Sequence, residues 1–182
     1  MRFLLFICIL LTTSMAAHGQ DAMEAKKTKA QAAAAEIVTM RSDLAKNFIK
    51  PDMEITEETF NKVCGAVGKR VKEIMATDGL TIRHVALKYR NPANAPKPAE
   101  MEDLQTFEKY PTLHDKWDEV EIDKKKYVRY QRSILVEKAC LACHGAKNNR
   151  PQFIVGKYPD DKAYDFKAGD FRAVIMVLIK KE

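Results

Sequence analysis

The pattern of hydrophobic and polar residues divides the chain into a helical first half and a strand-rich second half. Apolar residues recur at helical spacing between residues 21 and 50 and predict one long helix, which Pro51 ends. Thr56 is a candidate N-cap for a second helix, which runs to residue 76 and stops before Gly79. The first half therefore predicts two consecutive helices.

Strand patterns dominate the rest of the chain. The predicted strands cover residues 80–90, 117–122, 127–137 and 171–180, and the last is apolar enough to be a central strand. Three prolines make residues 91–98 a loop, and residues 99–109 predict a short helix. There is no internal repeat. This order of elements predicts an α+β domain, with a mainly antiparallel sheet flanked by helices.

The candidate chemistry lies directly after the third predicted strand, in the sequence Cys140-Leu141-Ala142-Cys143-His144. This is the C-x-x-C-H signature of c-type haem attachment. Each cysteine sulfur can add to one haem vinyl group, and the adjacent histidine becomes an axial ligand of the iron. The motif predicts one covalent haem c, attached through Cys140 and Cys143 and ligated by His144.

Three other chemistries use closely spaced cysteines. A redox dithiol usually opens a helix after a strand in a thioredoxin-like unit, and no such βαβ pattern surrounds this motif. A structural zinc site needs four ligands, commonly from two separated pairs, and the chain has no second C-x-x-C. A disulfide between Cys140 and Cys143 would leave His144 without a role. These alternatives stay open, but haem attachment is the interpretation that the motif favours.

The N-terminus has the layout of a secretory signal peptide. Arg2 precedes a short apolar run over residues 3–11, and the small residues Ala17 and Gly19 precede a polar segment. We predict that residues 1–19 are a signal peptide and that residues 20–182 form a single haem-binding domain. An uncleaved N-terminal anchor is the alternative, and it would be the only membrane contact that we expect. Because haem is attached to c-type proteins outside the cytoplasm, we expect a periplasmic or otherwise exported location.

Export leaves one cysteine to explain. Cleavage removes Cys8 and haem attachment uses two of the four cysteines, so Cys64 is left alone in the second predicted helix. It is either a small buried residue or the second axial ligand, as a thiolate opposite His144. His84 and His114 are further candidates for that position. The methionines of the mature chain are candidates too: Met23, Met40, Met53, Met75, Met101 and Met176. An open position is the last alternative.

Charge excludes one class of partner. The net charge is +6 at pH 7, but acidic residues interleave with the lysines, so the basic residues indicate solvated faces and no nucleic-acid-binding stripe. The charge is compatible with an acidic redox partner. An enzymatic role would need an open iron position beside a distal acid–base group, for which His84 and His114 are the candidates. We expect a protein that is not an enzyme.

Five segments carry a resemblance to a known family: residues 60–64 (FNKVC), 87–96 (LKYRNPANAP), 139–145 (ACLACHG), 158–163 (YPDDKA) and 169–172 (GDFR). In these segments the chain resembles the bacterial periplasmic monohaem c-type proteins with a PAS-like fold, long catalogued as a domain of unknown function. The resemblance spans nearly all of the mature chain. It implies a PAS-like α+β domain with a long N-terminal helix.

In that family the haem iron is ligated by the motif histidine and a helical cysteine, so the resemblance implies His144 and Cys64 as the axial ligands. Arg90 is a candidate contact for a haem propionate. We expect a redox or gas-responsive sensor, in which displacement of Cys64 opens a site for CO or NO and an unknown signalling or redox partner protein reads the change. The alternative is a low-potential electron-transfer cytochrome, because a thiolate ligand stabilises Fe(III).

Overall fold

The structure of the protein is a computed structural model, which describes the backbone of residues 4–181 and the side chains of residues 19–181. The predicted signal peptide, residues 1–19, therefore lies outside the residues whose side chains are described, apart from Gly19. Among the described residues, no helix combines the length and the apolar character that crossing a membrane requires.

The first element is a single long helix, α1, over Leu4–Phe48. Its second half packs on the rest of the domain through small residues, because Ala30, Ala34 and Ile37 are fully buried at helical spacing. The alanines let the helix lie close to the sheet. The helix predicted over residues 21–50 is confirmed as part of this longer element.

The second predicted helix has three segments: α2 over Glu57–Phe60, the π-helical segment η1 over Asn61–Gly65, and α3 over Ala66–Asp78. The Thr56 hydroxyl accepts a hydrogen bond from the backbone N–H of Thr59 at 3.2 Å, so the predicted N-cap is confirmed. The π-helical segment interrupts the regular helix one turn after its start. Such segments are rare and frequently mark functional sites.

The four strands form one antiparallel sheet in the order β1-β4-β3-β2. They span Thr81–Val85 (β1), Asp115–Ile122 (β2), Lys125–Leu135 (β3) and Phe171–Lys180 (β4). The predicted central position of the last strand is confirmed. The first strand is shorter than the predicted 80–90, because the N–H of Ala86 donates to the carbonyl of Asn94 at 3.0 Å and the chain leaves the sheet there.

A β-bulge changes the register between β3 and β4. Ile134 pairs with Ala173, but the next residue, Leu135, pairs with Phe171, which leaves Arg172 as the extra residue. A bulge bends the strand and re-aims a side chain. Arg172 consequently shares a cavity with Ile37 of α1, on the face of the sheet that Ala173 also occupies.

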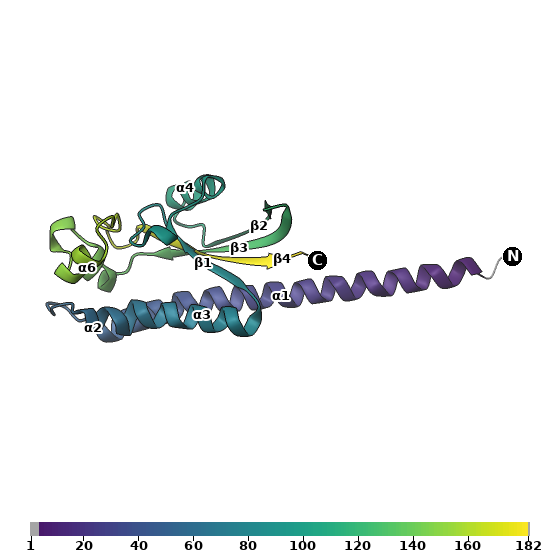
Figure 1. The fold of residues 1–182 in the computed structure, drawn as a ribbon, viewed down its shortest axis with the longest axis horizontal. Coiled ribbons are helices and arrows are strands. Elements are labelled where there is room, and N and C mark those ends of the chain that lie inside the picture. Colours follow the sequence, from purple (N-terminus) through teal and green to yellow (C-terminus); the bar gives the residue numbers. More distant parts are fainter. Residues whose placement is uncertain (1–3, 182) are drawn as a thin grey trace.

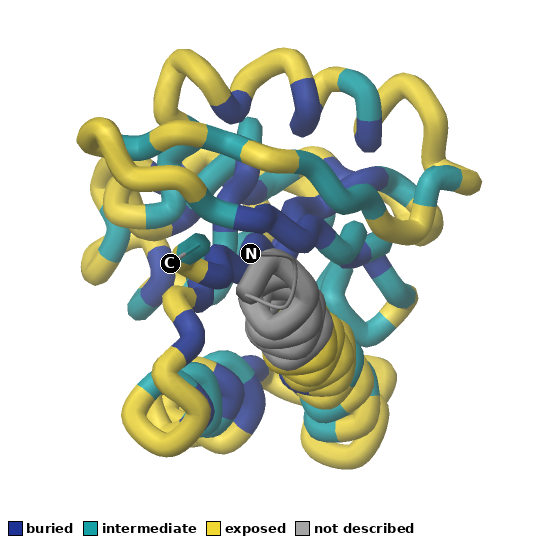
Figure 2. The backbone as a smooth tube through the Cα atoms, turned by 90° about the vertical axis from the view of Figure 1, so that its right-hand side faces the viewer, coloured by how far each residue is buried: buried dark blue, intermediate teal, exposed yellow. Residues whose placement is uncertain are grey.

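Helices cover both faces of the sheet. The side-by-side helices α1 and α3 lie on one face, here called the helix face, and α4 over Met101–Lys109 lies on the other, called the α4 face (Figure 1). Buried positions gather in the sheet and on the inward sides of the helices (Figure 2). The predicted α+β architecture is confirmed, including its antiparallel sheet and long N-terminal helix.

Short helical turns complete the chain. Two lie before α4, where the sequence predicts a proline-rich loop, and four lie between β3 and β4. They span Pro92–Asn94 (η2), Pro98–Glu100 (η3), Lys138–Cys140 (η4), Leu141–His144 (α5), Lys147–Asn149 (η5) and Gln152–Lys157 (α6).

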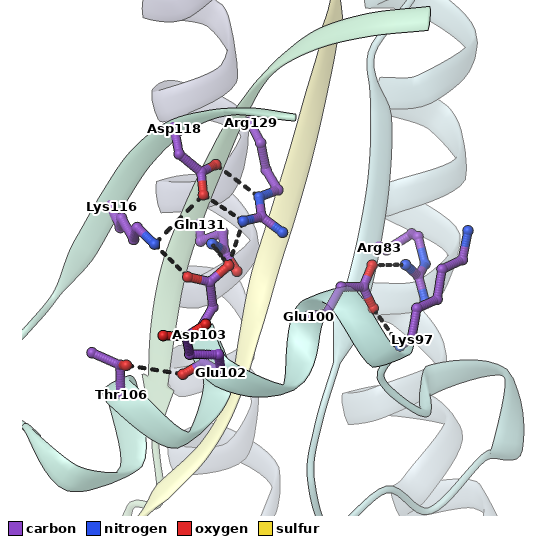
Figure 3. Close-up of polar contacts among 10 residues, drawn as sticks. All are labelled: Arg83, Lys97, Glu100, Glu102, Asp103, Thr106, Lys116, Asp118, Arg129 and Gln131. Carbon is purple, nitrogen blue, oxygen red and sulfur yellow. Dashed lines mark hydrogen bonds and ion pairs between the residues drawn. The ribbon is translucent and has the colours of Figure 1, made fainter. Parts of the chain in front are cut away.

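The α4 face holds a network of buried and partly buried charges. Asp103 of α4 binds Lys116 and Arg129, and Arg129 also binds Asp118 with a hydrogen bond from Nε to Oδ1 of 2.8 Å (Figure 3). Gln131 donates to Asp103 at 3.2 Å. These contacts join α4 to β2 and β3, and every charge in the network has a partner of opposite sign.

Candidate haem site

The C-x-x-C-H motif forms two tight turns, η4 and α5, directly after β3. Cys143 and His144 are buried, each with 9% of its surface exposed. Gly145 follows at a point where a Cβ atom would lie 2.7 Å from the carbonyl oxygen of Leu141, so no larger residue fits without a shift of the backbone. The turn therefore fixes the position of the histidine, which directly follows the second cysteine in the sequence.

The His144 ring has a defined protonation state. Its Nδ1 lies 2.7 Å from the carbonyl oxygen of Ala163, and because a carbonyl only accepts, Nδ1 carries the proton. Nε2 then has a free lone pair. Burial lowers the pKa of His144 well below its usual value, and Arg172 and Arg90 lower it further. A neutral imidazole with its other nitrogen tied to a carbonyl is the form that binds metals.

Asp161 stabilises this arrangement through its hydrogen bonds and through an ion pair. Its side chain is fully buried and accepts hydrogen bonds from the N–H of Ala163 at 2.8 Å and from Arg150 at 3.1 Å. Arg90 lies 3.4 Å from the same carboxylate and donates to the Cys143 carbonyl at 2.7 Å. One carboxylate thus fixes the carbonyl that holds His144 and the arginine that holds the motif. This role of Asp161 was not predicted from the sequence, although Asp161 lies in one of the family segments, residues 158–163.

Cys64 lies on the π-helical segment η1 and faces the motif. Cys64, Cys140, Cys143 and His144 together line one cavity, although Cys64 comes from a helix far earlier in the chain. All three described cysteines are free. The residues that the sequence singled out as haem attachment points and axial ligands are therefore brought to one place.

A larger cavity of about 480 Å³ adjoins this one, and Cys64 and His144 line both. It lies between η1 and α3 on one side and β1 on the other. Gly68 of α3 lines it, and a Cβ atom there would meet nothing within 4 Å. Because glycine costs a helix interior about 1 kcal/mol relative to alanine, its presence on an open helix face suits a flat group that lies close to the helix.

The other candidate ligands separate into two groups. His84 lines the larger cavity together with Cys64 and His144. His114 lies outside both cavities and is exposed, and none of the candidate methionines lines either one. Arg90, the candidate propionate contact, lines the larger cavity. The geometry therefore retains Cys64 and His84 near the motif histidine.

The surroundings of the motif fit a haem better than the alternative chemistries. Burial raises the pKa of Cys140 and raises the pKa of Cys143 to about 11, whereas a redox dithiol needs a lowered thiol pKa. The described side chains contain no cluster of three His, Cys, Asp or Glu that could hold a metal ion, which a zinc site needs. A haem iron needs only two protein ligands, because the porphyrin supplies four.

Comparison with known proteins agrees with this geometry. A structure described as the crystal structure of the cyanobacterial heme-protein Tll0287 shares 43% sequence identity, with a TM-score of 0.74, over 85% of this chain and 94% of that chain. This match confirms the predicted PAS-like fold class. Among curated proteins no match was found. The family model described as Tll0287-like matches residues 19–180, so the chain belongs to the Tll0287-like family, as the resemblance drawn from its sequence predicted.

Proposed function

We propose that this protein carries one covalent haem c, attached through Cys140 and Cys143, with His144 and Cys64 as axial ligands of the iron. The observation that carries the proposal is the single cavity lined by these four residues, three from one motif and one from η1. A relative of 43% identity described as a heme-protein supports it. When bound, the haem supplies an iron that changes between Fe(III) and Fe(II) and can bind diatomic gases.

The two ligand residues have different supports. His144 is held by the Ala163 carbonyl and the buried Asp161, so its imidazole is presented in one orientation. Cys64 is only half-buried and stands on a π-helical segment, where the hydrogen-bond pattern changes from i→i−4 to i→i−5. We infer that His144 is the permanent ligand and that Cys64 is the ligand that can leave.

This asymmetry favours a sensor of redox state or of a gas such as CO or NO. Release of Cys64 would change the positions of η1 and α3, which pack on α1. A partner protein that binds these helices would detect the change. We propose that the protein acts outside the cytoplasm after removal of residues 1–19, and that it is not an enzyme. The alternative is a low-potential electron-transfer cytochrome, in which both ligands stay bound.

The first experiment is the optical spectrum of the exported, matured protein, oxidised and reduced, with CO added to the reduced form. The absence of a covalent haem spectrum would overturn the proposal. CO binding by the reduced wild-type protein supports the sensor, and a reduced spectrum that CO does not change supports the electron carrier.

Cys64→Ala tests the ligand assignment, with His114→Ala as the matched control because His114 lies outside both cavities. We expect Cys64→Ala to change the oxidised spectrum and to bind CO at least as readily as the wild type, because it removes the leaving ligand. His114→Ala should match the wild type. An unchanged spectrum for Cys64→Ala would eliminate Cys64 as a ligand.

A further inference from the structure

The larger cavity contains nearly all of the unsatisfied polar atoms in the described part of the chain. Among the described residues, five buried side-chain nitrogen or oxygen atoms have no hydrogen-bond partner. Four of these atoms belong to residues that line the larger cavity. They are Nε of Arg41, Nε2 of His84, Nε of Arg90 and Nε of Arg172. The three arginine nitrogens are donors, and Nε2 of His84 is a donor in one of its two tautomers, so acceptor oxygens would satisfy all four. An unsatisfied buried donor costs about 1–3 kcal/mol, and such atoms are rare in folded proteins.

The charges in the cavity are also unbalanced. Four arginines line it, of which Arg83 is paired with Glu100 and Arg90 lies 3.4 Å from Asp161. That leaves Arg41 and Arg172, and neither has a carboxylate partner within ion-pair distance. Arg172 donates only to the carbonyl of Lys88, at 3.0 Å. Two cations without counter-charges therefore face the same space.

Burial makes this arrangement costly. Desolvation lowers the pKa of Arg172 to about 9, and the like charges of Arg41 and Arg90 add to the effect. The charge of Asp161 acts in the opposite direction but does not outweigh these effects, and its oxygens already accept from Ala163 and Arg150. The β-bulge that leaves Arg172 unpaired in the ladder also turns this charge toward the cavity.

His84 adds a neutral donor beside these two cations. It lies on β1, opposite Ile175 of β4, and neither of its ring nitrogens makes a hydrogen bond to a described residue. Burial lowers its pKa well below the usual value, and the charges of Arg41 and Arg172 are the next causes. A neutral imidazole that lines the same cavity as these two arginines can donate one N–H to an anionic oxygen.

We propose that Arg41, His84 and Arg172 form a carboxylate-binding pole that receives the two propionates of the haem. Two propionates carry the charge that neutralises two arginines, and their oxygens supply the acceptors that the four orphaned nitrogens lack. The inference rests on the proposed haem binding: the vinyl groups would bond to Cys140 and Cys143, and the propionates would lie in the larger cavity. There they would reach Arg41, His84 and Arg172, of which the two arginines also line the smaller cavity beside the cysteines.

The test compares the holoprotein with an apoprotein made by Cys140→Ala/Cys143→Ala. In the apoprotein, Arg172→Gln removes an unpaired buried charge, so we expect its melting temperature to stay equal or rise. In the holoprotein the same substitution removes a propionate partner, so we expect the melting temperature to fall. Arg172→Lys keeps the charge and should restore part of the holoprotein stability. A fall of similar size in both forms would overturn the proposal, because it would indicate a purely structural role.

Arg129→Gln is the matched control, since Arg129 is equally buried but paired with Asp103 and Asp118 on the α4 face. It should destabilise both forms alike. A second readout is the midpoint potential of the holoprotein: Arg41→Gln and Arg172→Gln should each make it more negative, because a lost positive charge favours Fe(III), whereas Arg129→Gln should leave it nearly unchanged. Equal shifts in all three variants would also overturn the proposal.

A free anion is the other source of the same chemistry. If inorganic phosphate raises the melting temperature of the apoprotein but not that of its Arg172→Gln variant, and the holoprotein is indifferent to Arg172→Gln, the pole binds a free anion and the propionate assignment is wrong. Failure of the haem proposal itself is distinguishable, because the wild-type protein would then show no covalent haem spectrum.

Discussion

Arg129 and Arg172 make an instructive pair, because they lie on adjacent strands and are almost equally buried, at 6% and 7% exposed. On the α4 face, Arg129 binds Asp103 and Asp118 (Figure 3). On the helix face, Arg172 donates to one backbone carbonyl, lies over the ring of Phe166 and makes no ion pair with a described residue, and the charges of two other arginines act on it more strongly than that of Asp161. Within the described part of the chain, an arginine side chain is therefore paired with two carboxylates on one face of the sheet and makes no ion pair on the other.

The pKa values report this difference. Burial acts to lower the pKa of Arg129, but Asp118 and Asp103 outweigh it and the pKa is raised. For Arg172, burial and the neighbouring arginines act together and lower the pKa to about 9. The α4 face is therefore electrostatically complete within the chain. On the helix face the compensation of Arg172 is incomplete, and in the proposed haem complex the anionic propionates of the haem complete it.

The largest expected effect comes from breaking the complete face. Arg129→Met leaves the buried Asp103 and the partly buried Asp118 with fewer partners, and we expect it to lower the free energy of unfolding of the apoprotein by about 3–5 kcal/mol. Urea denaturation measures this. Arg132→Met is the control on the same strand, because Arg132 is only half-buried and lies 3.7 Å from Asp115, and we expect a change of at most about 1 kcal/mol. Equal losses in the two variants would erase the contrast between the faces.

The two faces of the sheet are expected to lose stability in different pH ranges. The folded-state pKa of His84 is depressed below 6.5, so the unfolded chain takes up the proton and the apoprotein loses stability as pH falls below about 6.5. The loss reaches at most about 1.4 kcal/mol per pH unit for one histidine. The pKa of Asp103 is lowered as well: burial acts to raise it, but Lys116, Arg129 and Gln131 outweigh burial. Its stabilisation is therefore lost only below about pH 4.

Unfolding of the apoprotein between pH 7.5 and 5 tests this separation. We expect His84→Phe to flatten the pH dependence by the share of one histidine, leaving that of His144. His114→Gln is the control, since His114 is exposed and lies outside both cavities. A pH profile of His84→Phe identical to that of the wild type would contradict this prediction, because it would show that His84 does not contribute to the pH dependence of unfolding.

The smallest expected effect concerns the open surface of α3. Gly68→Ala should stabilise the apoprotein by up to about 1 kcal/mol, because alanine favours a helix and its methyl group meets empty space. In the matured protein the same methyl group would compete with the haem, so we expect a lower yield of covalent haem. Gly156→Ala in α6, outside both cavities, should leave haem content unchanged. Normal haem content in Gly68→Ala would place the haem elsewhere in the cavity.

Local rules sufficed for much of the fold. The N-cap at Thr56, the central strand at residues 171–180 and the haem motif with its candidate partner Cys64 could all be inferred from residue types and spacing. These features depend on near neighbours or on one long apolar run. The central position of the last strand can be inferred from its continuous apolar run, and nine of its ten residues are indeed buried.

What could not be predicted depends on register and distant pairing. The bulge at Arg172 arises from how β3 meets β4, and no residue in the sequence signals it. The end of β1 at Val85 is set by a hydrogen bond from Ala86 to Asn94, in a loop that follows. Likewise, the partner of His144 is the carbonyl of Ala163, a backbone atom that every residue type offers.

The π-helical segment around Cys64 has a consequence for how this fold can change. Adjacent residues of a helix differ by about 100° in direction, so one residue inserted or removed within η1 turns everything before it relative to everything after it. Deleting Lys62 would restore a regular helix and swing the side chains before the deletion away from their present direction while leaving α3 seated on α1. The relation between α2 and the cysteine that faces His144 is thus a matter of counting residues, and a single codon gained or lost is enough to alter it.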